Sequence, residues 1–283
     1  MPGPKESVGL LAPGNPRLKR LRKLISQPRA RREEGCFVVD GPILVGEALA
    51  AHCNQVTVHE VYAEADYHRG VELVDQARQT GITGFEVVDG SLDRVLQVRS
   101  PQPVAAVVSR HESMVEVFNR KGTAILLVDA NDPGNVGTVM RSAEAAGMVG
   151  IILAGASVDP TNAKVLRASA GAGLRLPIVQ LDDLAAALEL PPLDSRPLVA
   201  TAAVGIGGVA VRSHHDVDLR NAIVAIGNEA NGLPQWLLEQ ADTIARIDMA
   251  GPTESLNLSV AASLFCFEAL RQQRNSLDNT QSE

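Results

Sequence analysis

Aromatic side chains are scarce in this sequence: five Phe, two Tyr and one Trp make up 3% of its 283 residues. This composition argues against RNA recognition by rows of stacked bases, because such surfaces need exposed rings. Acidic residues also outnumber basic ones, 33 to 26, and the net charge of −7 argues against binding to a polyanion. Taken alone, these two features disfavour a nucleic-acid-binding protein.

Paired cysteines, a signal peptide and a membrane span are also missing. Cys36, Cys53 and Cys266 form no C-x-x-C pair, so no zinc ribbon or redox dithiol is predicted, and unpaired thiols are typical of a reducing cytosol. No stretch approaches the roughly 20 apolar residues of a membrane span. His214 and His215 are adjacent, so we expect them to point apart, and no metal-ligand spacing surrounds them. We therefore expect a cytoplasmic protein with no metal and no membrane partner.

The charge that is present is unevenly spread. Residues 1–34 carry nine basic and three acidic side chains, a net charge of +6, which leaves −13 for the other 249 residues. Leu18, Leu21 and Leu24 recur at helical spacing, so one helix face can pack while another presents basic groups. A charge run is commonly a solvated helix face, but the density here favours contact with RNA. The residues predicted to make this contact are Arg17, Lys19, Arg20, Arg22, Lys23, Arg31 and Arg32.

Short β-like stretches alternate with helical ones through most of the chain, which predicts an α/β fold with a mostly parallel sheet covered on both faces. The expected division is a basic N-terminal arm over 1–34, a small α/β domain over 35–110, a linker over 111–122, a second α/β domain over 123–275 and a polar tail over 276–283. The strands expected in the second domain are 124–129, 150–153, 176–179, 198–202 and 222–226, and its final helix spans about 256–273.

A first cluster of chemically informative residues, 129–147, follows the first of these strands. Such strand ends are where open parallel sheets bind ligands. Asn135 lies near a predicted helix start, where free N–H groups suit an anion. Arg141 lies over a turn later, and its guanidinium fork suits a phosphate. We expect both to face one crevice, although a helix cap and a surface arginine would also explain them.

Two further clusters follow later strands. In 223–237, glycines flank Glu229 and allow a close approach to a ligand, although a plain strand–turn–helix connection would also fit. In 246–270, Ser255 and Asn257 open the final helix, and Ser255 is expected to cap it. The sequence has no G-x-S-x-G elbow, no Walker loop and no clean G-x-G-x-x-G after a strand, so these chemistries are not indicated.

Together the three clusters resemble the motifs of the SpoU (TrmH-like) family of RNA 2′-O-ribose methyltransferases in the SPOUT superfamily. The motifs are N-x-G-x-x-x-R at 135–141, I-G-x-E-x-x-G-L at 226–233 and hydrophobic-x-M-x-G-x-x-x-S-L-N at 247–257. Each is weak alone, but three in this order are specific. The arrangement is similar to actinobacterial ribosomal RNA methyltransferases, including those of the thiostrepton-resistance type. Asp248 stands where many members have proline, a departure expected to change loop stiffness rather than chemistry.

The resemblance implies a trefoil-knotted catalytic domain, preceded by a substrate-binding domain similar to a small RNA-binding ribosomal protein. It implies S-adenosylmethionine as the cofactor, RNA as the partner with ribosomal RNA favoured, and a homodimer whose subunits help to complete each other's sites. The catalytic residues that it implies are Asn135, Arg141, Glu229, Ser255 and Asn257. The cofactor contacts that it implies are Thr201, Gly227, Ile247, Met249 and Leu256. Arg167 joins the residues expected to meet RNA.

A guanidinium is effectively always protonated, so we expect Arg141 to bind an RNA phosphate and stabilise the developing alkoxide, while a phosphate oxygen takes the proton. Asn135 would orient the ribose or Arg141, and Glu229 would hold Arg141 or an RNA group. Ser255 and Asn257 would shape the cofactor loop and contact the substrate. Three alternatives stay open: a tRNA 2′-O-methyltransferase, a non-catalytic RNA-binding protein with the same knot, and a nucleotide-dependent enzyme on an ordinary doubly wound sheet.

Overall fold

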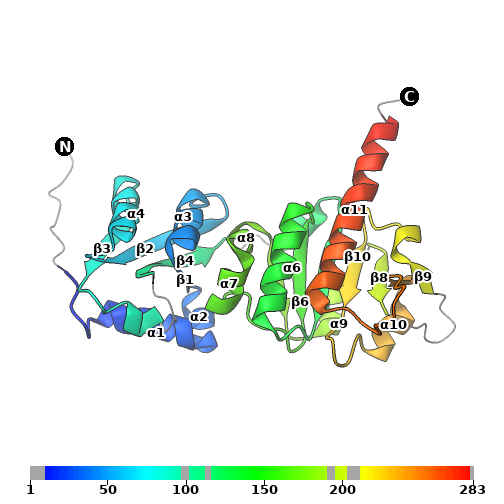
Figure 1. Cartoon of the computed structure of the whole chain (residues 1–283), viewed down its shortest axis with the longest axis horizontal. Helices are drawn as coiled ribbons and strands as arrows, with labels where there is room; N and C mark the ends of the chain where they lie inside the picture. Colours follow the sequence, from blue (N-terminus) through cyan, green and yellow to red (C-terminus); the bar gives the residue numbers. More distant parts are fainter. Residues whose placement is uncertain (1–9, 97–101, 112–115, 190–194, 203–210, 281–283) are drawn as a thin grey trace. The chain divides into compact units, whose positions relative to one another are not determined.

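The computed structural model describes residues 10–96, 102–111, 116–189, 195–202 and 211–280, and the chain divides into two compact units (Figure 1). The first unit comprises Met1–His111 and Thr161–Arg175, and the second comprises Glu112–Pro160 and Leu176–Glu283. The break after His111 falls at the start of the expected linker. The segment Thr161–Arg175, in contrast, was expected in the second domain, and the structure builds it into the first unit.

The first unit is built on a four-stranded sheet in the order β1-β4-β2-β3. Its strands are β1 (Phe37–Asp40), β2 (Val56–Glu64), β3 (Thr83–Val87) and β4 (Val104–Arg110). Strand β4 runs antiparallel to β1 and β2, whereas β2 and β3 are parallel. Its helices are α1 (Pro16–Ser26), α2 (Pro28–Glu34), α3 (Pro42–Ala50), α4 (His68–Gln79), α5 (Asp93–Leu96), α7 (Ala163–Ser169) and α8 (Ala172–Arg175).

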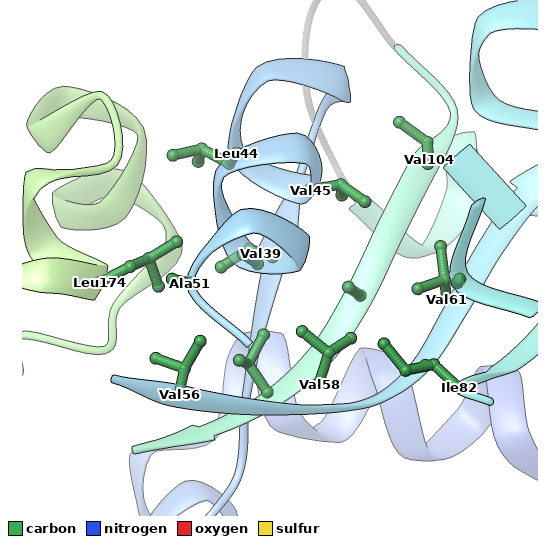
Figure 2. Packing of buried hydrophobic residues seen from close by; sticks show 14 of the residues in the cluster. Val39, Leu44, Val45, Ala51, Val56, Val58, Val61, Ile82, Val104 and Leu174 are labelled. Atoms are coloured by element: carbon green, nitrogen blue, oxygen red, sulfur yellow. The ribbon is translucent and has the colours of Figure 1, made fainter. Parts of the chain in front are cut away.

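Alternation along the strands gives this sheet a core on each face, because successive side chains point to opposite sides. Val39 and Val104 point to the side covered by α3 and α4, where Leu44 and Val45 of α3 face them (Figure 2). The neighbouring Val38 points to the side covered by α1 and α5. Both faces of this sheet are therefore covered by helices.

Helices α1 and α2 cover most of the segment expected to be a separate basic arm. Leu18, Leu21 and Leu24 are buried in the core beneath α1, and Ala30 of α2 is buried with them. The helical spacing of the leucines explains this packing, since all three lie on one side of α1. The described part of the segment is an integral layer of the first unit rather than a detached arm.

The segment Thr161–Arg175 is anchored to the rest of the first unit by apolar and polar contacts. Leu166 and Leu174 are buried in the core on the α3 side, where Figure 2 shows Leu174. Arg175 forms an ion pair with Glu47 of α3, and Arg110 of β4 donates a hydrogen bond to the Gly173 carbonyl. Sequence periodicity could not reveal these contacts, because their partners lie more than 60 residues away in the chain.

The second unit is built on a seven-stranded sheet in the order β7-β6-β5-β10-β8-β11-β9, and every pair described in it is parallel. Its strands are β5 (Ala124–Val128), β6 (Gly150–Ala154), β7 (Ile178–Leu181), β8 (Leu198–Thr201), β9 (Val211–Ser213), β10 (Ile223–Ile226) and β11 (Thr243–Arg246). The expected α/β class and parallel sheet are confirmed. Strands β9 and β11 were not among the expected strands; β9 has only three residues and none is buried, and β11 has only four residues.

Two long helices, α6 (Pro133–Ala145) and α11 (Leu258–Thr280), pack side by side in the second unit (Figure 1). The Ser142 and Ser263 hydroxyls form a hydrogen bond of 2.7 Å between them, which small side chains permit by allowing the helices to approach. The remaining helices are α9 (Leu184–Leu188), α10 (Gln235–Gln240) and the 3-10 turns η1 (Glu116–Asn119) and η2 (His214–Asp216). None of the helices in the described residues is long and apolar enough to cross a bilayer.

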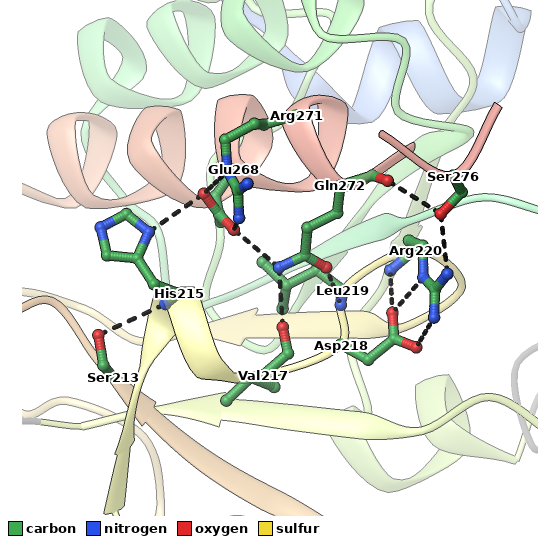
Figure 3. A network of polar contacts seen from close by, with 10 residues as sticks. All are labelled: Ser213, His215, Val217, Asp218, Leu219, Arg220, Glu268, Arg271, Gln272 and Ser276. Atoms are coloured by element: carbon green, nitrogen blue, oxygen red, sulfur yellow. Dashed lines mark hydrogen bonds and ion pairs between the residues drawn. The ribbon is translucent and has the colours of Figure 1, made fainter. Parts of the chain in front are cut away.

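A polar network joins η2 to α11 (Figure 3). Buried Glu268 of α11 accepts hydrogen bonds from Arg271 and Gln272 and contacts His215 at 3.2 Å. The rings of His214 and His215 lie 3.8 Å apart between centroids, so the expectation that they point apart is wrong. Both belong to a helical turn, in which neighbouring side chains diverge less than in a strand. Within the described ranges, no group of three or more His, Cys, Asp or Glu side chains is arranged to hold a metal.

Candidate active site

A pocket opens at the carboxyl ends of β8, β10 and β11, three neighbouring strands of the parallel sheet. This is the edge at which such sheets bind ligands. All five residues expected to contact a cofactor line it: Thr201, Gly227, Ile247, Met249 and Leu256. Two of the residues expected in catalysis, Glu229 and Ser255, also line it. Asn135, Arg141 and Asn257 are not among the residues that line the pocket.

The loop after β10 turns back tightly on itself at the pocket wall. The Gly232 N–H donates to the Asn228 carbonyl at 2.7 Å, which closes the turn. A Cβ on Gly227 would lie 2.2 Å from the Gly232 carbonyl carbon, closer than real Cβ contacts allow. The close approach of the Gly232 backbone therefore requires glycine at 227, whether or not a ligand is bound.

Asn228 anchors this loop to the neighbouring strand β5. Its side-chain N–H₂ donates to the Asp129 carbonyl at 3.1 Å, and its side-chain oxygen accepts from the Ala230 N–H at 2.8 Å. Asp129 has a φ of +55°, and its carboxylate accepts from the Ala156 N–H at 2.7 Å. A left-handed aspartate at the end of a central strand is a strained position of the kind that functional sites retain. No role was predicted for these two residues from the sequence. The available signals were the position of Asp129 directly after a buried strand and the position of Asn228 beside a glycine.

Three side chains from the three motifs meet at the pocket. Asn135 of α6 donates a side-chain hydrogen bond to the Glu229 carboxylate, and Asn257 donates to the Asn135 side-chain oxygen at 3.0 Å. The same Glu229 carboxylate lies 3.4 Å from the Leu258 N–H, at the start of α11. Asp132 caps α6 by accepting from the Asn135 N–H at 2.8 Å, which fixes the position of Asn135. Segments more than 90 residues apart in the chain are thus joined by one chain of hydrogen bonds.

Asn257, rather than Ser255, caps the final helix. Its side-chain oxygen accepts from the Ser259 and Val260 N–H groups at 2.9 and 3.4 Å, so α11 begins at Leu258. The expectation that Ser255 is the cap is wrong, because asparagine is an equally good cap and stands two residues closer to the helix. Ser255 is exposed on the loop before the helix, on the pocket wall.

Arg141 is exposed on α6 and forms no ion pair or hydrogen bond with the described residues. It does not line the pocket, and the six residues that separate it from Asn135 place the two side chains roughly 120° apart around the helix axis. It is also not held by Glu229, whose carboxylate is engaged by Asn135. The guanidinium is thus available for a group from outside the chain, while Asn135 has a structural partner.

The pocket has the chemistry that S-adenosylmethionine requires. Ile226, Leu258 and Phe265 provide apolar wall for a purine ring, and the Glu229 and Glu254 carboxylates suit a ligand with a positive sulfonium and ammonium group. These five residues come from β10, its following loop and the region around the start of α11.

Arg246 supplies the positive group of the same pocket and is ion-paired with Asp248 at 3.1 Å. A hydrogen bond from Ser213 lowers the pKa of Asp248, and Arg246 lowers it further. The residue that replaces the family's proline therefore orients an arginine of the pocket, besides any effect on loop stiffness.

Four of the residues expected to bind RNA are engaged within the first unit. Arg17 and Arg20 form ion pairs with Glu60 of β2, and Arg20 pairs with Glu34 as well. Arg31 is buried and donates to the Leu24 and Ile25 carbonyls at 2.8 and 3.1 Å. These arginines fasten α1 and α2 to their surroundings.

Arg167, the fourth of these residues, contacts both oxygens of Asp40 at 2.9 and 3.0 Å. Burial raises the pKa of the Asp40 carboxyl, and the arginine counteracts this by favouring its charged form. The other four residues expected to bind RNA are exposed and form no ion pair with the described residues: Lys19, Arg22, Lys23 and Arg32.

Comparison with known proteins identifies the family of this chain. The model of the SpoU rRNA Methylase family matches residues 122–267, which is more than half of the chain. The chain belongs to the SpoU rRNA methylase family. The family expected from the three motifs is confirmed, and with it the class of enzyme, an RNA methyltransferase. The model of the MRM3-like substrate binding domain matches residues 15–106, a range that includes α1 and α2.

Individual relatives of this SpoU family member cover most of its length. A 23S rRNA (guanosine-2'-O-)-methyltransferase RlmB from Xanthomonas axonopodis pv. citri is 35% identical over 76% of this chain and 89% of the relative. The AdoMet-bound rRNA methyltransferase of Sinorhizobium meliloti superposes with a TM-score of 0.77 at 28% identity, covering 91% of this chain and 95% of that one. The SpoU methyltransferase AviRb of Streptomyces viridochromogenes, solved with AdoMet, has a TM-score of 0.77 at 25% identity, covering 92% of this chain and all of that one.

Proposed function

We propose that this SpoU family member transfers the methyl group of S-adenosylmethionine to a ribose 2′-hydroxyl of ribosomal RNA. The observation that carries the proposal is the meeting of Asn135, Glu229 and Asn257, one residue from each motif, at the edge of a single pocket. The RNA class is supported by the substrate named for the RlmB relative. A ribosomal RNA substrate also fits the cytoplasmic location expected from the sequence.

The pocket after β10 is the proposed cofactor site. The backbone around Gly227 and Leu256 and the apolar residue Phe265 would hold the adenosine and methionine parts, with Glu229 and Glu254 near the positive groups. When bound, S-adenosylmethionine supplies an electrophilic methyl group. Because carboxylates attract a sulfonium but repel RNA, this part of the site favours the cofactor over the polyanion.

Arg141 is the proposed group for the RNA. Its exposed guanidinium would bind the phosphate next to the reacting ribose and stabilise the oxygen as it becomes negative. The methyl–sulfur bond breaks as the methyl–oxygen bond forms, and the hydroxyl proton passes to a phosphate oxygen. Asn135 would act as a positioning residue, because it fixes Glu229 and the start of α11.

A homodimer and a trefoil knot, both implied by the family resemblance, complete the proposal. Val260, Leu264 and Phe267 are 47%, 40% and 50% exposed and follow each other on one side of α11. An exposed apolar stripe of this kind suits a second copy of the chain. In such a dimer, as the family resemblance implies, Arg141 of one subunit would help to complete the site of the other.

The experiment is methyl transfer from labelled S-adenosylmethionine to ribosomal RNA of a strain lacking the protein, followed by mapping of 2′-O-methyl groups. We expect a single new site in ribosomal RNA after addition of the purified protein. Transfer to tRNA but not to ribosomal RNA would overturn ribosomal RNA as the substrate and identify tRNA in its place. Binding of RNA without any transfer would overturn the proposed activity.

A further inference from the structure

Charge is divided unevenly between the two units. The first unit contains 17 basic and 13 acidic residues, and the second contains 9 basic and 20 acidic residues. The net charges are therefore +4 and −11. A polyanion approaching this protein is attracted by the first unit and repelled by most of the second.

Within the first unit, three of the unpaired cations lie together on one side of α1. Lys19, Arg22 and Lys23 are exposed and form no ion pair with the described residues. Lys19 and Lys23 are four residues apart, so they are neighbours on the helix surface, and Arg22 lies beside them. The three side chains point away from Leu18 and Leu21, which are buried on the opposite side of the helix.

The other arginines of α1 hold this surface in place. Glu60 of β2 accepts from Arg17 and Arg20, and Tyr62 donates its hydroxyl to the same carboxylate at 2.7 Å. The Arg17 guanidinium also lies 4.5 Å from the centre of the Phe85 ring. Because this network and the buried leucines fix α1, the backbone that carries its positive side chains is preformed, and binding does not have to order it.

The aromatic residues of the first unit determine which polyanion this surface suits. Its four aromatic residues are Phe37, Tyr62, Tyr67 and Phe85, and none is exposed: three are buried and Tyr67 is half-buried. Single-stranded nucleic acids are typically held by stacking on exposed rings, whereas double-stranded RNA is recognised by shape and backbone contacts. A positive surface without rings therefore suits a duplex.

We propose that Lys19, Arg22 and Lys23 form a preformed surface that binds the phosphate backbone of double-stranded RNA. The surface presents a structured region of the substrate to the enzyme without reading its sequence. The proposal deepens the proposed function, and it rests on that function only for the choice of RNA as the polyanion.

The test compares the full-length protein with a triple variant, Lys19→Ala/Arg22→Ala/Lys23→Ala, in binding to a labelled RNA duplex of about 16 base pairs. Fluorescence anisotropy is measured between about 50 and 200 mM salt. We expect at least about tenfold weaker binding at the lowest salt. The slope of log affinity against log salt should fall by about two to three, since each lost phosphate contact contributes about 0.7–0.9. Lys19→Arg/Lys23→Arg should keep both the affinity and the slope, because it preserves the charge.

A matched control removes three other exposed cations that have no ion pair among the described residues, as Arg69→Ala/Lys121→Ala/Arg274→Ala. It should keep the affinity of the wild type within about threefold. Wild-type affinity and slope in the α1 variant would overturn the proposal, and so would an equal loss in the control. A loss confined to a single-stranded RNA probe would overturn the assignment to a duplex.

Cofactor binding separates this proposal from the proposed function. The α1 variant should bind S-adenosylmethionine as the wild type does, and its kcat at saturating RNA should be retained while KM for RNA rises. If the wild type binds the duplex through α1 but transfers no methyl group, the proposed function fails while the surface stands. If transfer proceeds with unchanged KM in the α1 variant, the surface fails while the proposed function stands.

Discussion

The two units differ in where they place charge and in what that charge can bind. The first unit neutralises several of its arginines with its own acids, as in the pairs Arg20–Glu34 and Arg167–Asp40, and leaves a few cations exposed on α1. The second unit is strongly acidic and places Glu229 and Glu254 at a pocket beside a buried parallel sheet. The first arrangement suits a polyanion, and the second suits a small cationic ligand.

This division explains why the whole-chain charge of −7 misleads. The same division opposes catalysis, because the acidic second unit repels the RNA phosphates that it must approach. Arg141 is an exposed cation of that unit with no ion pair among its described residues, so it is the group best placed to offset the repulsion. Variants that act on one unit and spare the other will test the division.

Replacement of Arg141 by alanine should have the largest effect. We expect kcat to fall by at least about 100-fold, the size typical of removing a group that stabilises a developing oxyanion. The Kd for S-adenosylmethionine should stay within about threefold, since the side chain does not line the pocket. Single-turnover transfer and calorimetry measure the two quantities. Retention of more than about a tenth of the wild-type rate would contradict the role.

Gly227→Ala should weaken cofactor binding but leave RNA binding intact. The added Cβ would meet the Gly232 backbone at 2.2 Å, so the loop after β10 has to open and distort the pocket. We expect Kd for S-adenosylmethionine to rise at least about tenfold, the effect of about 1.4 kcal/mol. The control is Gly46→Ala in α3, where an added Cβ meets nothing within 4 Å and helix propensity improves. Equal cofactor affinity in the two variants would contradict the role of Gly227.

The sequence predicts the sheet well because its central strands are completely buried. The runs Ala124–Val128 and Ile223–Ile226 are apolar throughout, as in a parallel sheet covered on both faces, and the structure places them side by side. Strand β9 lacks such a run and was missed. The order of the three motifs was equally informative about the pocket, since all five residues expected to contact the cofactor line its walls.

The partners of individual polar side chains were not predictable, because they depend on contacts that are distant in sequence. Ser255 and Asn257 are both good helix caps, and only the structure shows that Asn257 fills this role while also contacting Asn135. Glu229 was expected to hold Arg141 or an RNA group, and within the chain it accepts from Asn135. Long-range acids likewise decide which arginines of the basic segment are free, as Glu60 does for Arg17.

Asn228→Ala should produce a moderate effect in the second unit only. The variant loses the hydrogen bond to the Asp129 carbonyl and the one from the Ala230 N–H, so the loop after β10 is less well fixed. A hydrogen bond of this kind contributes about 1 kcal/mol, which corresponds to roughly fivefold in affinity. We expect KM for S-adenosylmethionine to rise by about that factor while kcat and RNA affinity change little. Asn231→Ala in the exposed part of the same loop is the control, and a fall in kcat equal to that of Arg141→Ala would show that Asn228 does not act through the loop.

The smallest effect on activity is expected from Glu268→Gln. This variant tests whether the ionised carboxylate of Glu268 stabilises the second unit (Figure 3). Hydrogen bonds from Arg271, then Gln272 and His215, lower the pKa of Glu268 from 4.5 to about 2. The ionised carboxylate therefore stabilises the fold fully above pH 4.5, and this contribution is lost as the pH falls toward 2.

At pH 7 the Glu268→Gln variant should lose about 1–3 kcal/mol of unfolding free energy, whereas near pH 2 its stability should approach that of the wild type. Thermal unfolding across this range measures the difference, with Glu239→Gln on the exposed side of α10 as the control. A stability difference that stays constant from pH 7 to pH 2 would show that the carboxylate's charge does not stabilise the junction of η2 and α11.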